Sequence, residues 1–296
     1  MPALAFARAS GVPDFWTDDD HLTDVTGATW HVWDDPAVDW TAYDLVVVRQ
    51  TWDYTGRREA FLRWAASLAG RIENPAEVIA WNTDKRYLLD AQRAGLAVVP
   101  TAYLAPGAAA AVQDAGGAYV VKPSVSAGAR DTVVFGPGAA EAARAAALVA
   151  DIHRSGRTAM VQPHVASVDV RGETGLYFYG GAFSHAIAKG AVLERGADVV
   201  DDLGFRQPVA PREPSGAEMD LAERAVAWLA ERFGEVPAYV RVDVVLGDAN
   251  GTPQLLELEL IEPSMWFAHA PAGAEERFAA VLRERAERAP RRRRVA

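Results

Sequence analysis

The sequence predicts an α/β protein that is divided into two or three lobes. Helices and strands alternate in some parts of the chain and are grouped separately in others, so the class extends from α/β to α+β. The chain has 296 residues, of which 50% are hydrophobic, enough to bury a sizeable core. Short apolar runs rich in Val, Tyr and Phe alternate with segments whose apolar residues recur every three or four positions. There are no cysteines, which excludes disulfides, thiolate metal sites and a cysteine nucleophile.

The first eighty residues are expected to form a small α/β unit. Apolar runs predict strands at 2–8, 28–34 and 44–54, and an amphipathic segment predicts a helix at 58–70. Residues 72–82, IENPAEVIAWN, carry Asn-Pro turn chemistry and are expected to be a linker.

The middle of the chain begins with an expected helix at 84–95. Thr83 is its predicted N-cap and Gly95 its predicted end. Strand-like runs and one long alanine-rich helical segment follow; the strands are expected at 98–104, 118–124, 132–135 and 158–165, and the helix at 139–154.

The last part combines hairpins with two further helices. Residues 170–189 predict two antiparallel strands joined by the two-residue turn Gly180-Gly181. Helices are expected at 216–234 and 274–288. Between them, residues 238–264 predict two strands joined by an Asp-Ala-Asn-Gly turn.

Charge and segment composition exclude several classes of protein. The net charge of −10 argues against a nucleic-acid surface, and the four arginines at 291–294 are expected to be a solvated tail. No secretory signal and no run of about 18 apolar residues is present, so we expect a cytoplasmic protein without membrane partners. The motifs GxxxxGKS/T, GxGxxG after the first strand, HExxH and GxSxG are missing.

The stretch LLELELIEPS, residues 255–264, has an acidic face. Glu257 and Glu259 alternate with Leu256, Leu258 and Leu260, so on an extended strand the carboxylates share one face and the leucines the other. A half-buried strand with a wet outer face would give the same pattern. If Asp243 on the preceding strand faces the two glutamates, three carboxylates gather that need cations, and hard oxygen ligands suit Mg²⁺.

Lysine is scarce in this chain. Of 30 basic residues only Lys85, Lys122 and Lys189 are lysines. Lys122 ends an apolar strand and precedes a loop of small residues that contains Ser124, Ser126 and Gly128. Backbone N–H groups, hydroxyls and an ammonium can cradle phosphate, although an ordinary polar loop looks the same. A phosphate loop together with a magnesium site indicates a nucleoside triphosphate.

The order of these parts, from about Asn82 to Ser264, resembles the ATP-grasp superfamily, in particular carboxylate–amine ligases such as glutathione synthetase, D-alanine–D-alanine ligase and the ribosomal-protein glutamate ligase. The resemblance implies a three-lobed ATP-grasp fold: a short N-terminal lobe at 1–81, two ATP-clasping lobes at 82–160 and 161–290, and the basic tail at 291–296.

The same resemblance implies which residues bind the nucleotide. Lys85 and Lys122 match the two phosphate lysines, and the segment SVSAGARD, with Ser124, Ser126 and Gly128, matches the loop that closes over the phosphates. The hinge that holds adenine is matched by MVQPHV, and Asp-x-Arg by DVR. The implied contacts there are adenine at Gln162, Pro163 and Val165, and ribose at Asp169.

On the metal and substrate side, Asp243, Glu257 and Glu259 match the ligands of two Mg²⁺ ions. Catalytic roles are implied for Lys189, which would reach the γ-phosphate, and for Arg171 and Arg241; an internal salt bridge to Asp243 is the alternative for Arg241. Substrate contacts are expected from Arg171, Arg241, Ser264 and Arg49. Arg49 ends a strand of the first lobe, where ligand sites gather, or supports a turn together with Asp53.

Two departures from the family pattern stand out. Glu259 occupies a position where asparagine is usual, which adds negative charge, and Glu262 is out of phase with the acidic pair and is expected in a loop or behind the ligands. Pro163 and His164 replace an acidic or amide residue and an aromatic one in the hinge, so adenine would be held there by backbone groups.

The resemblance implies an ATP-dependent ligase that activates a carboxylate as an acyl phosphate and forms an amide with a nitrogen nucleophile. RGETGLYFYGGAFSHAIAK and ELELIEPS look most like the subgroup that contains the D-cycloserine-forming ligase, which implies ring closure of O-ureido-D-serine. Two alternatives stay open: an intermolecular amino-acid or peptide ligase, and a nucleotide-binding regulator without turnover. The expected partner is an amino-acid-like small molecule, and a homodimer is considered as well.

Overall fold

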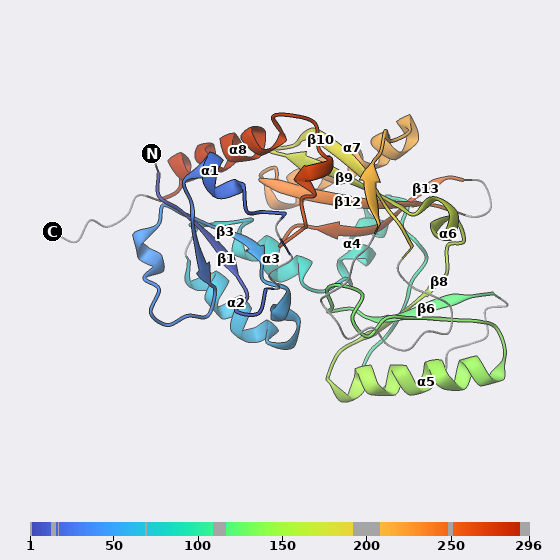
Figure 1. Ribbon diagram of the computed structural model, residues 1–296. Helices are drawn as coiled ribbons and strands as arrows, with labels where there is room; N and C mark the ends of the chain where they lie inside the picture. Colours follow the sequence, from blue (N-terminus) through green and yellow to red (C-terminus); the bar gives the residue numbers. More distant parts are fainter. Residues whose placement is uncertain are drawn as a thin grey trace.

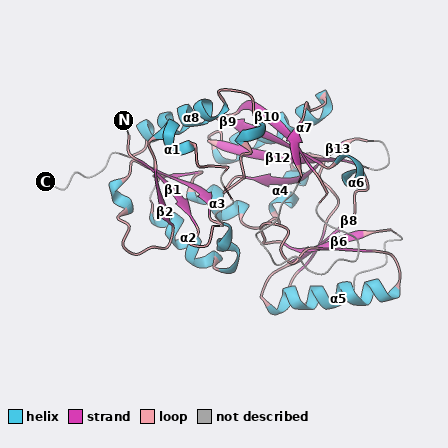
Figure 2. Cartoon of the chain, viewed as in Figure 1, coloured by secondary structure: helices cyan, strands magenta, loops and turns pink. Residues whose placement is uncertain are grey.

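The computed structural model describes residues 2–12, 16, 18–68, 70–108, 117–191, 208–247 and 251–290. Three sheets organise this part of the chain, and Figures 1 and 2 show how helices flank them. The expected turn at 248–250 and the tail at 291–296 lie outside the described residues. Among the described helices, none has the length and apolar character needed to cross a membrane.

The first sheet is parallel and has the strand order β2-β1-β3-β4. Its strands are β1 (Leu4–Arg8), β2 (Thr29–Val32), β3 (Leu45–Gln50) and β4 (Ile72–Glu73). Its helical segments are α1 (Leu22–Thr26), η1 (Trp40–Ala42), η2 (Trp52–Gly56), α2 (Arg58–Ser67) and α3 (Ala76–Asn82). The apolar residues of α2 cover one face of this sheet, and α8 (Ala274–Arg288) returns from the end of the chain to cover the other (Figure 1).

The second sheet is antiparallel, with the order β5-β8-β6-β7. Its strands are β5 (Ala102–Leu104), β6 (Tyr119–Pro123), β7 (Val133–Phe135) and β8 (Ala159–Pro163). The long helix α5 (Ala139–Arg154) lies across it, since Ala145, Val149 and Ile152 share one face of the helix and pack on the strands (Figure 1).

The third sheet is antiparallel, with the order β11-β10-β9-β12-β13. Its strands are β9 (Glu173–Tyr179), β10 (Ala182–Lys189), β11 (Val209–Pro211), β12 (Tyr239–Leu246) and β13 (Pro253–Glu259). Three more helical segments accompany it: α6 (Ser167–Arg171), α7 (Gly216–Phe233) and η3 (Phe267–His269). A capping box between Ser215 and Glu218 starts α7, which packs with α4 (Tyr87–Arg93) on one face of the sheet.

Most predicted elements are confirmed, including the helices at 139–154 and 274–288. Two expectations around residue 80 are wrong. The expected linker at 72–82 contains β4 and α3, and Thr83 ends α3 rather than starting the next helix, which begins at Tyr87. The hydroxyl of Thr83 donates to Ala80 O at 2.9 Å. The Asn-Pro pair does turn the chain, but Pro75 there opens a helix.

Asn74 explains why this segment is ordered. Its buried amide donates to Tyr239 O at 2.9 Å and Leu260 O at 2.7 Å, and accepts from Ala238 N at 2.8 Å. These bonds tie the end of β4 to the third sheet, and a sequence window around Asn74 cannot reveal partners more than 160 residues away.

Glu73 gives a pH-dependent prediction. Burial raises the pKa of Glu73 from 4.5 to about 7, although Arg285 opposes the shift. The folded protein therefore binds more protons than the unfolded chain between these values, so this group lowers the free energy of unfolding as pH rises from 4.5 to 7, by at most about 3 kcal/mol. Glu73→Gln should flatten that part of a stability profile measured by urea denaturation. A wild-type profile with the same slope as the variant would contradict the assignment.

Candidate active site

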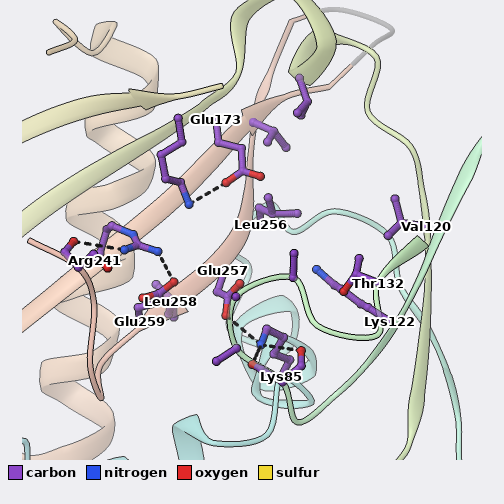
Figure 3. A pocket seen from close by; sticks show the side chains of 18 of the residues that line it. Lys85, Val120, Lys122, Thr132, Glu173, Arg241, Leu256, Glu257, Leu258 and Glu259 are labelled. Carbon is purple, nitrogen blue, oxygen red and sulfur yellow. Dashed lines mark hydrogen bonds and ion pairs between the residues drawn. The ribbon is translucent and has the colours of Figure 1, made fainter. Parts of the chain in front are cut away.

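A cavity of about 310 Å³ is lined by side chains from all three sheets and their connections. Its charged lining includes three lysines, four glutamates and one arginine: Lys85, Lys122, Lys189, Glu173, Glu257, Glu259, Glu262 and Arg241. Figure 3 shows six of them, namely Lys85, Lys122, Glu173, Glu257, Glu259 and Arg241. Most of the candidate residues identified in the sequence therefore meet in one place, although they are spread over 180 positions.

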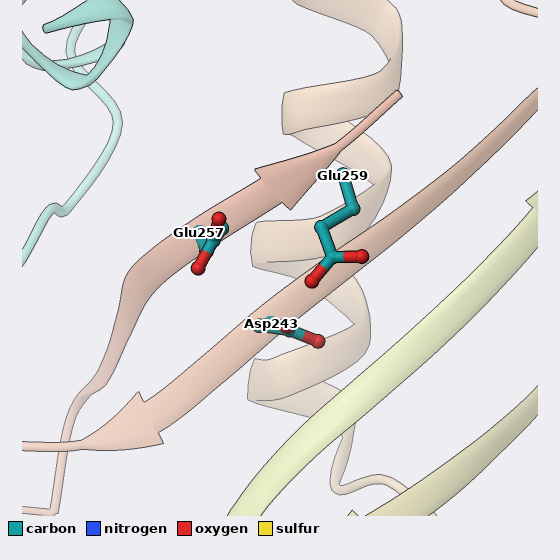
Figure 4. A group of neighbouring side chains, drawn as sticks. All are labelled: Asp243, Glu257 and Glu259. Carbon is teal, nitrogen blue, oxygen red and sulfur yellow. The ribbon is translucent and has the colours of Figure 1, made fainter. Parts of the chain in front are cut away.

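The acidic face of β13 lies opposite Asp243 on β12. In the register of these strands Glu257 pairs with Asp243, and Glu259 pairs with Arg241. Carboxylate oxygens of Asp243, Glu257 and Glu259 lie within 4.8 Å of one another (Figure 4). The juxtaposition expected from alternation along the strand is present, and oxygen ligands at this spacing fit a hard divalent cation.

Leu256 departs from the expected alternation. Asp243 pairs with Glu257 but Val244 pairs with Leu255, so Leu256 is the extra residue of a β-bulge. Leu258 and Leu260 belong to the buried core as expected, whereas Leu256 is only half-buried; Leu256 and Leu258 both line the cavity beside Glu257. The bulge therefore gives the acidic face an apolar neighbour.

Basic groups neutralise these acids in the ligand-free protein. Lys189 Nζ lies 2.7 Å from Asp243 Oδ2 and 2.8 Å from Glu173 Oε2. Arg241 Nε donates to Asp243 Oδ1 at 2.8 Å, and its Nη2 also contacts Glu259. The internal ion pair considered for Arg241 is thus present, and in this state both basic groups face the acids.

The pKa values of two of these acids shift in opposite directions. Burial would raise the pKa of Asp243, but Arg241 and Lys189 hold it below its usual value. For Glu259 burial prevails, assisted by repulsion from Glu257 and Asp243, and raises the pKa to about 7. A carboxyl group that takes up a proton so readily would give it up to a bound cation, so the donor set fits Mg²⁺.

Lys85 reaches this face because the edge of β13 is held by side chains. Asn82 donates to Leu258 O at 2.8 Å and accepts from Leu260 N at 2.9 Å, and the hydroxyl of Tyr87 bonds both Leu258 N and O. Lys85 lies between these two anchors. Its Nζ donates to Ser126 O at 2.7 Å and lies 3.1 Å from Glu257 Oε1.

The expected phosphate loop follows β6. Lys122 points into the cavity beside Thr132 (Figure 3), and burial lowers its pKa. Ser126 and Gly128 line the cavity, and Gly128 adopts a positive φ of 62°. Ser124 is buried and does not line it: its N–H donates to Thr158 O at 2.8 Å and its carbonyl accepts from Lys85 N at 2.7 Å.

The expected adenine hinge runs from β8 into α6. Gln162, Pro163 and Val165 line the cavity, with Gln162 Nε2 donating to Thr101 Oγ1 at 2.8 Å. Asp169 also lines it and lies 3.2 Å from His164 Nε2. Arg171 is exposed at the end of α6 and does not line the cavity.

The first sheet contributes aromatic side chains rather than Arg49. Arg49 is 1% exposed, and its Nη2 donates to Asp19 Oδ1 and Pro263 O, both at 2.9 Å. The cavity is instead lined by Trp52 and Tyr54, which follow β3, together with Trp16. The strand end identified in the sequence is near the site, but the residues just beyond it were missed.

Three further residues line the cavity. Ser264, a candidate from the sequence, lines the cavity while its carbonyl accepts from the hydroxyl of Tyr177 at 2.7 Å. Glu173 and Glu262 also line it. Glu173 was missed because its partner Lys189 lies across a hairpin, and only the strand register would have paired them.

Gly175 on β9 leaves room for the Arg241–Asp243 pair. A Cβ atom at this position would lie 3.1 Å from Asp243 Oδ1 and 3.2 Å from Arg241 Cδ. We expect Gly175→Ala to lower kcat about tenfold, because the buried pair must shift by a few tenths of an ångström. Gly216→Ala is the control, since a Cβ there meets nothing within 4 Å. Equal kcat values for the two variants in an ADP-release assay would contradict the expectation.

Comparisons with known proteins agree with this geometry. Residues 4–74 match the family described as "D-cycloserine synthetase DcsG, N-terminal domain". The "Cycloserine biosynthesis protein DcsG" of Streptomyces lavendulae is 38% identical over 266 residues, which cover 86% of this chain and 87% of that protein.

Solved structures give the same result. The crystal structure of D-cycloserine synthetase DcsG matches with a TM-score of 0.86 and 33% identity, over 96% of this chain and 99% of that one. The D-alanine–D-alanine ligase of Bacillus anthracis complexed with ATP matches with a TM-score of 0.65 over 97% and 98% of the two chains, and at 11% identity it supports the fold alone. The chain therefore belongs to the DcsG family of ATP-grasp ligases and is an ATP-dependent carbon–nitrogen ligase.

Proposed function

We propose that the protein closes O-ureido-D-serine to D-cycloserine at the expense of ATP. The names of the relatives support the product. The observation that carries the chemistry is the cavity in which three lysines meet Glu257 and Glu259, with the buried carboxylate of Asp243 directly behind these two acids. ATP would bind between the lobes at 82–160 and 161–290, with the small lobe at 1–81 closing the substrate end.

The nucleotide would be held by the residues that line the cavity from β6 to α6. Lys85, Lys122, Ser126 and Gly128 would face the phosphates, with Ser124 supporting their loop. Gln162, Pro163 and Val165 would contact adenine, and Asp169 the ribose. Asp243, Glu257 and Glu259 would hold two Mg²⁺ ions, which when bound neutralise charge on the phosphates.

The reaction would proceed in three steps. The substrate carboxylate attacks the γ-phosphorus of ATP, releasing ADP and giving an acyl phosphate. The ureido nitrogen bound to oxygen then attacks the acyl carbon, phosphate leaves and the five-membered ring closes. Hydrolysis removes the carbamoyl group as carbon dioxide and ammonia.

The protein would contribute position and charge to these steps. Lys189 on β10 and Arg241 on β12 line the cavity from either side of β9 and would turn to the transferring phosphoryl group once Asp243 is otherwise neutralised. Arg171 and Arg49 stay candidates for the substrate only if they move, because neither lines the cavity as it stands. A homodimer and a cytoplasmic location also stay predictions.

ADP release with Mg²⁺ across a panel of amino acids tests the proposal. O-ureido-D-serine should stimulate release the most and yield D-cycloserine without any added amine. Stimulation that requires a second amino acid would indicate an intermolecular ligase instead. ATP binding without stimulation by any carboxylate would indicate a regulator.

A further inference from the structure

Two charged side chains of the cavity have no ion-pair partner among the described residues. The other charged groups are paired: Lys85 with Glu257, Lys189 with Glu173 and Asp243, Arg241 with Asp243 and Glu259, and His164 with Asp169. Lys122 and Glu262 remain. One cation and one anion are therefore left for ligands to neutralise.

These two groups face different parts of the cavity. The residues on either side of Glu262 contact the first sheet: Ile261 packs among its apolar residues, and the carbonyl of Pro263 accepts from Arg49. Lys122 comes from β6, at the proposed phosphate end. Glu262 follows β13 and lies towards the first sheet, where Arg49 ends β3.

Because Glu262 is buried, the lack of a partner for its carboxylate is energetically unfavourable. Its side chain belongs to a residue that is only 8% exposed, and neither a hydrogen bond nor an ion pair satisfies it within the described chain. Burial raises the pKa of Glu262 well above its usual value, and the charges of Glu259 and Glu257 add to this. A buried carboxylate without a partner is unfavourable, so a structure that retains one gains from a ligand that supplies the counter-charge.

The cavity that Glu262 lines also has aromatic walls. Trp52, Tyr54 and Trp266 line the same cavity, and the ring of Trp16 lies 5.1 Å from that of Trp52 and 5.5 Å from that of Trp266. Such walls exclude water, which strengthens a charge–charge contact, and their faces attract cations. A small organic ammonium therefore matches this end better than a hydrated metal ion does.

We propose that Glu262 binds the α-ammonium group of the amino-acid substrate and so selects amino acids over other carboxylates. This inference rests on the proposed function, because it assumes that the small substrate occupies the aromatic end of the cavity. The ammonium and carboxylate of an α-amino acid share one carbon atom, so an ammonium held at Glu262 would keep the carboxylate close to it, in the cavity that Glu259 and Arg241 also line. The phosphoryl group would arrive in the same cavity.

A pair of substrates and a pair of variants test the assignment. O-ureido-D-serine is compared with 3-(ureidooxy)propanoate, which lacks only the α-amino group. The wild-type enzyme should favour the amino acid by about 30-fold or more in kcat/KM, and Glu262→Gln should reduce this preference to near parity by raising KM for the amino acid. KM for ATP should not change. Glu262→Asp, which keeps the charge, should retain part of the preference.

Glu73→Gln is the matched control. Glu73 is another buried glutamate, 7% exposed, but it does not line the cavity, so its variant should keep the wild-type preference. Binding of both compounds with MgADP, measured by calorimetry, gives the same comparison without turnover.

Several outcomes would overturn the inference. The inference is wrong if the wild-type enzyme accepts both compounds equally, even if it forms D-cycloserine. It is also wrong if the Glu262→Gln variant retains the preference for the amino acid. A variant that loses kcat equally on both compounds, with an altered pH profile, would make Glu262 a proton acceptor. If the wild type does not use O-ureido-D-serine, the proposed function is wrong. The inference about Glu262 then requires another amino acid that binds to the wild type more tightly than it binds to the Glu262→Gln variant. If no amino acid does so, the inference is wrong as well.

Discussion

Glu257→Gln is expected to reduce kcat by about 10³-fold, because an amide is a weaker ligand for Mg²⁺ and the lost neutralisation of phosphate charge costs several kcal/mol in the transition state. Stability should change by less than about 1 kcal/mol. The fold should tolerate the change because the Lys85 ammonium, which then lacks its ion pair with Glu257, still donates a hydrogen bond to Ser126 O at 2.7 Å. Steady-state ADP release and thermal unfolding measure the two effects.

The comparison of activity with stability decides what the acidic strand does. Glu73→Gln, in a buried position outside the cavity, should leave kcat at the wild-type value. If Glu257→Gln unfolded the protein, or if its kcat matched that of the control, the acidic face of β13 would be structural. The half-buried strand with a wet face would then be the better interpretation.

Much of the fold could be predicted because its signals are local. The apolar face of α5 and the β-turn glycines of the β9–β10 hairpin are written in short windows, and these elements lie where expected. The segment at 72–82 failed because its order depends on Asn74, whose amide bonds Tyr239 and Leu260. An Asn-Pro pair carries the same local signal in a linker and in a docked turn.

The candidate site divides in the same way. Alternation along β13 was sufficient to find Glu257 and Glu259, since strand period alone puts them on one face. It misled for Leu256, because a bulge adds a residue without a mark in the sequence. Trp16, Trp52 and Glu262 reach the cavity only through the packing of the first sheet on the third, so spacing could not identify them.

Lys189→Met is expected to make folding stability depend on Mg²⁺. In the ligand-free protein the ammonium of Lys189, 7% exposed, lies 2.7 Å from Asp243 and 2.8 Å from Glu173. Its removal leaves Asp243 with Arg241 alone, and breaking a buried pair costs about 3 kcal/mol or more. With a chelator present, Tm should fall by roughly 5 °C or more for a chain of this size.

Magnesium should restore much of this loss, since a cation that binds the folded state alone stabilises it by mass action. The wild type should gain less, because Lys189 already neutralises the carboxylates and competes with the metal. Lys122→Met is the matched control: this lysine lines the same cavity but has no ion-pair partner among the described residues, so Mg²⁺ should shift its Tm no more than that of the wild type. Equal Mg²⁺ shifts for both variants would mean that Asp243, Glu257 and Glu259 do not bind the metal. A larger Mg²⁺-dependent rise in Tm for Lys189→Met than for Lys122→Met would indicate that these carboxylates bind the metal. The reason is that only in Lys189→Met does Mg²⁺ replace a positive charge that neutralises them in the wild-type fold.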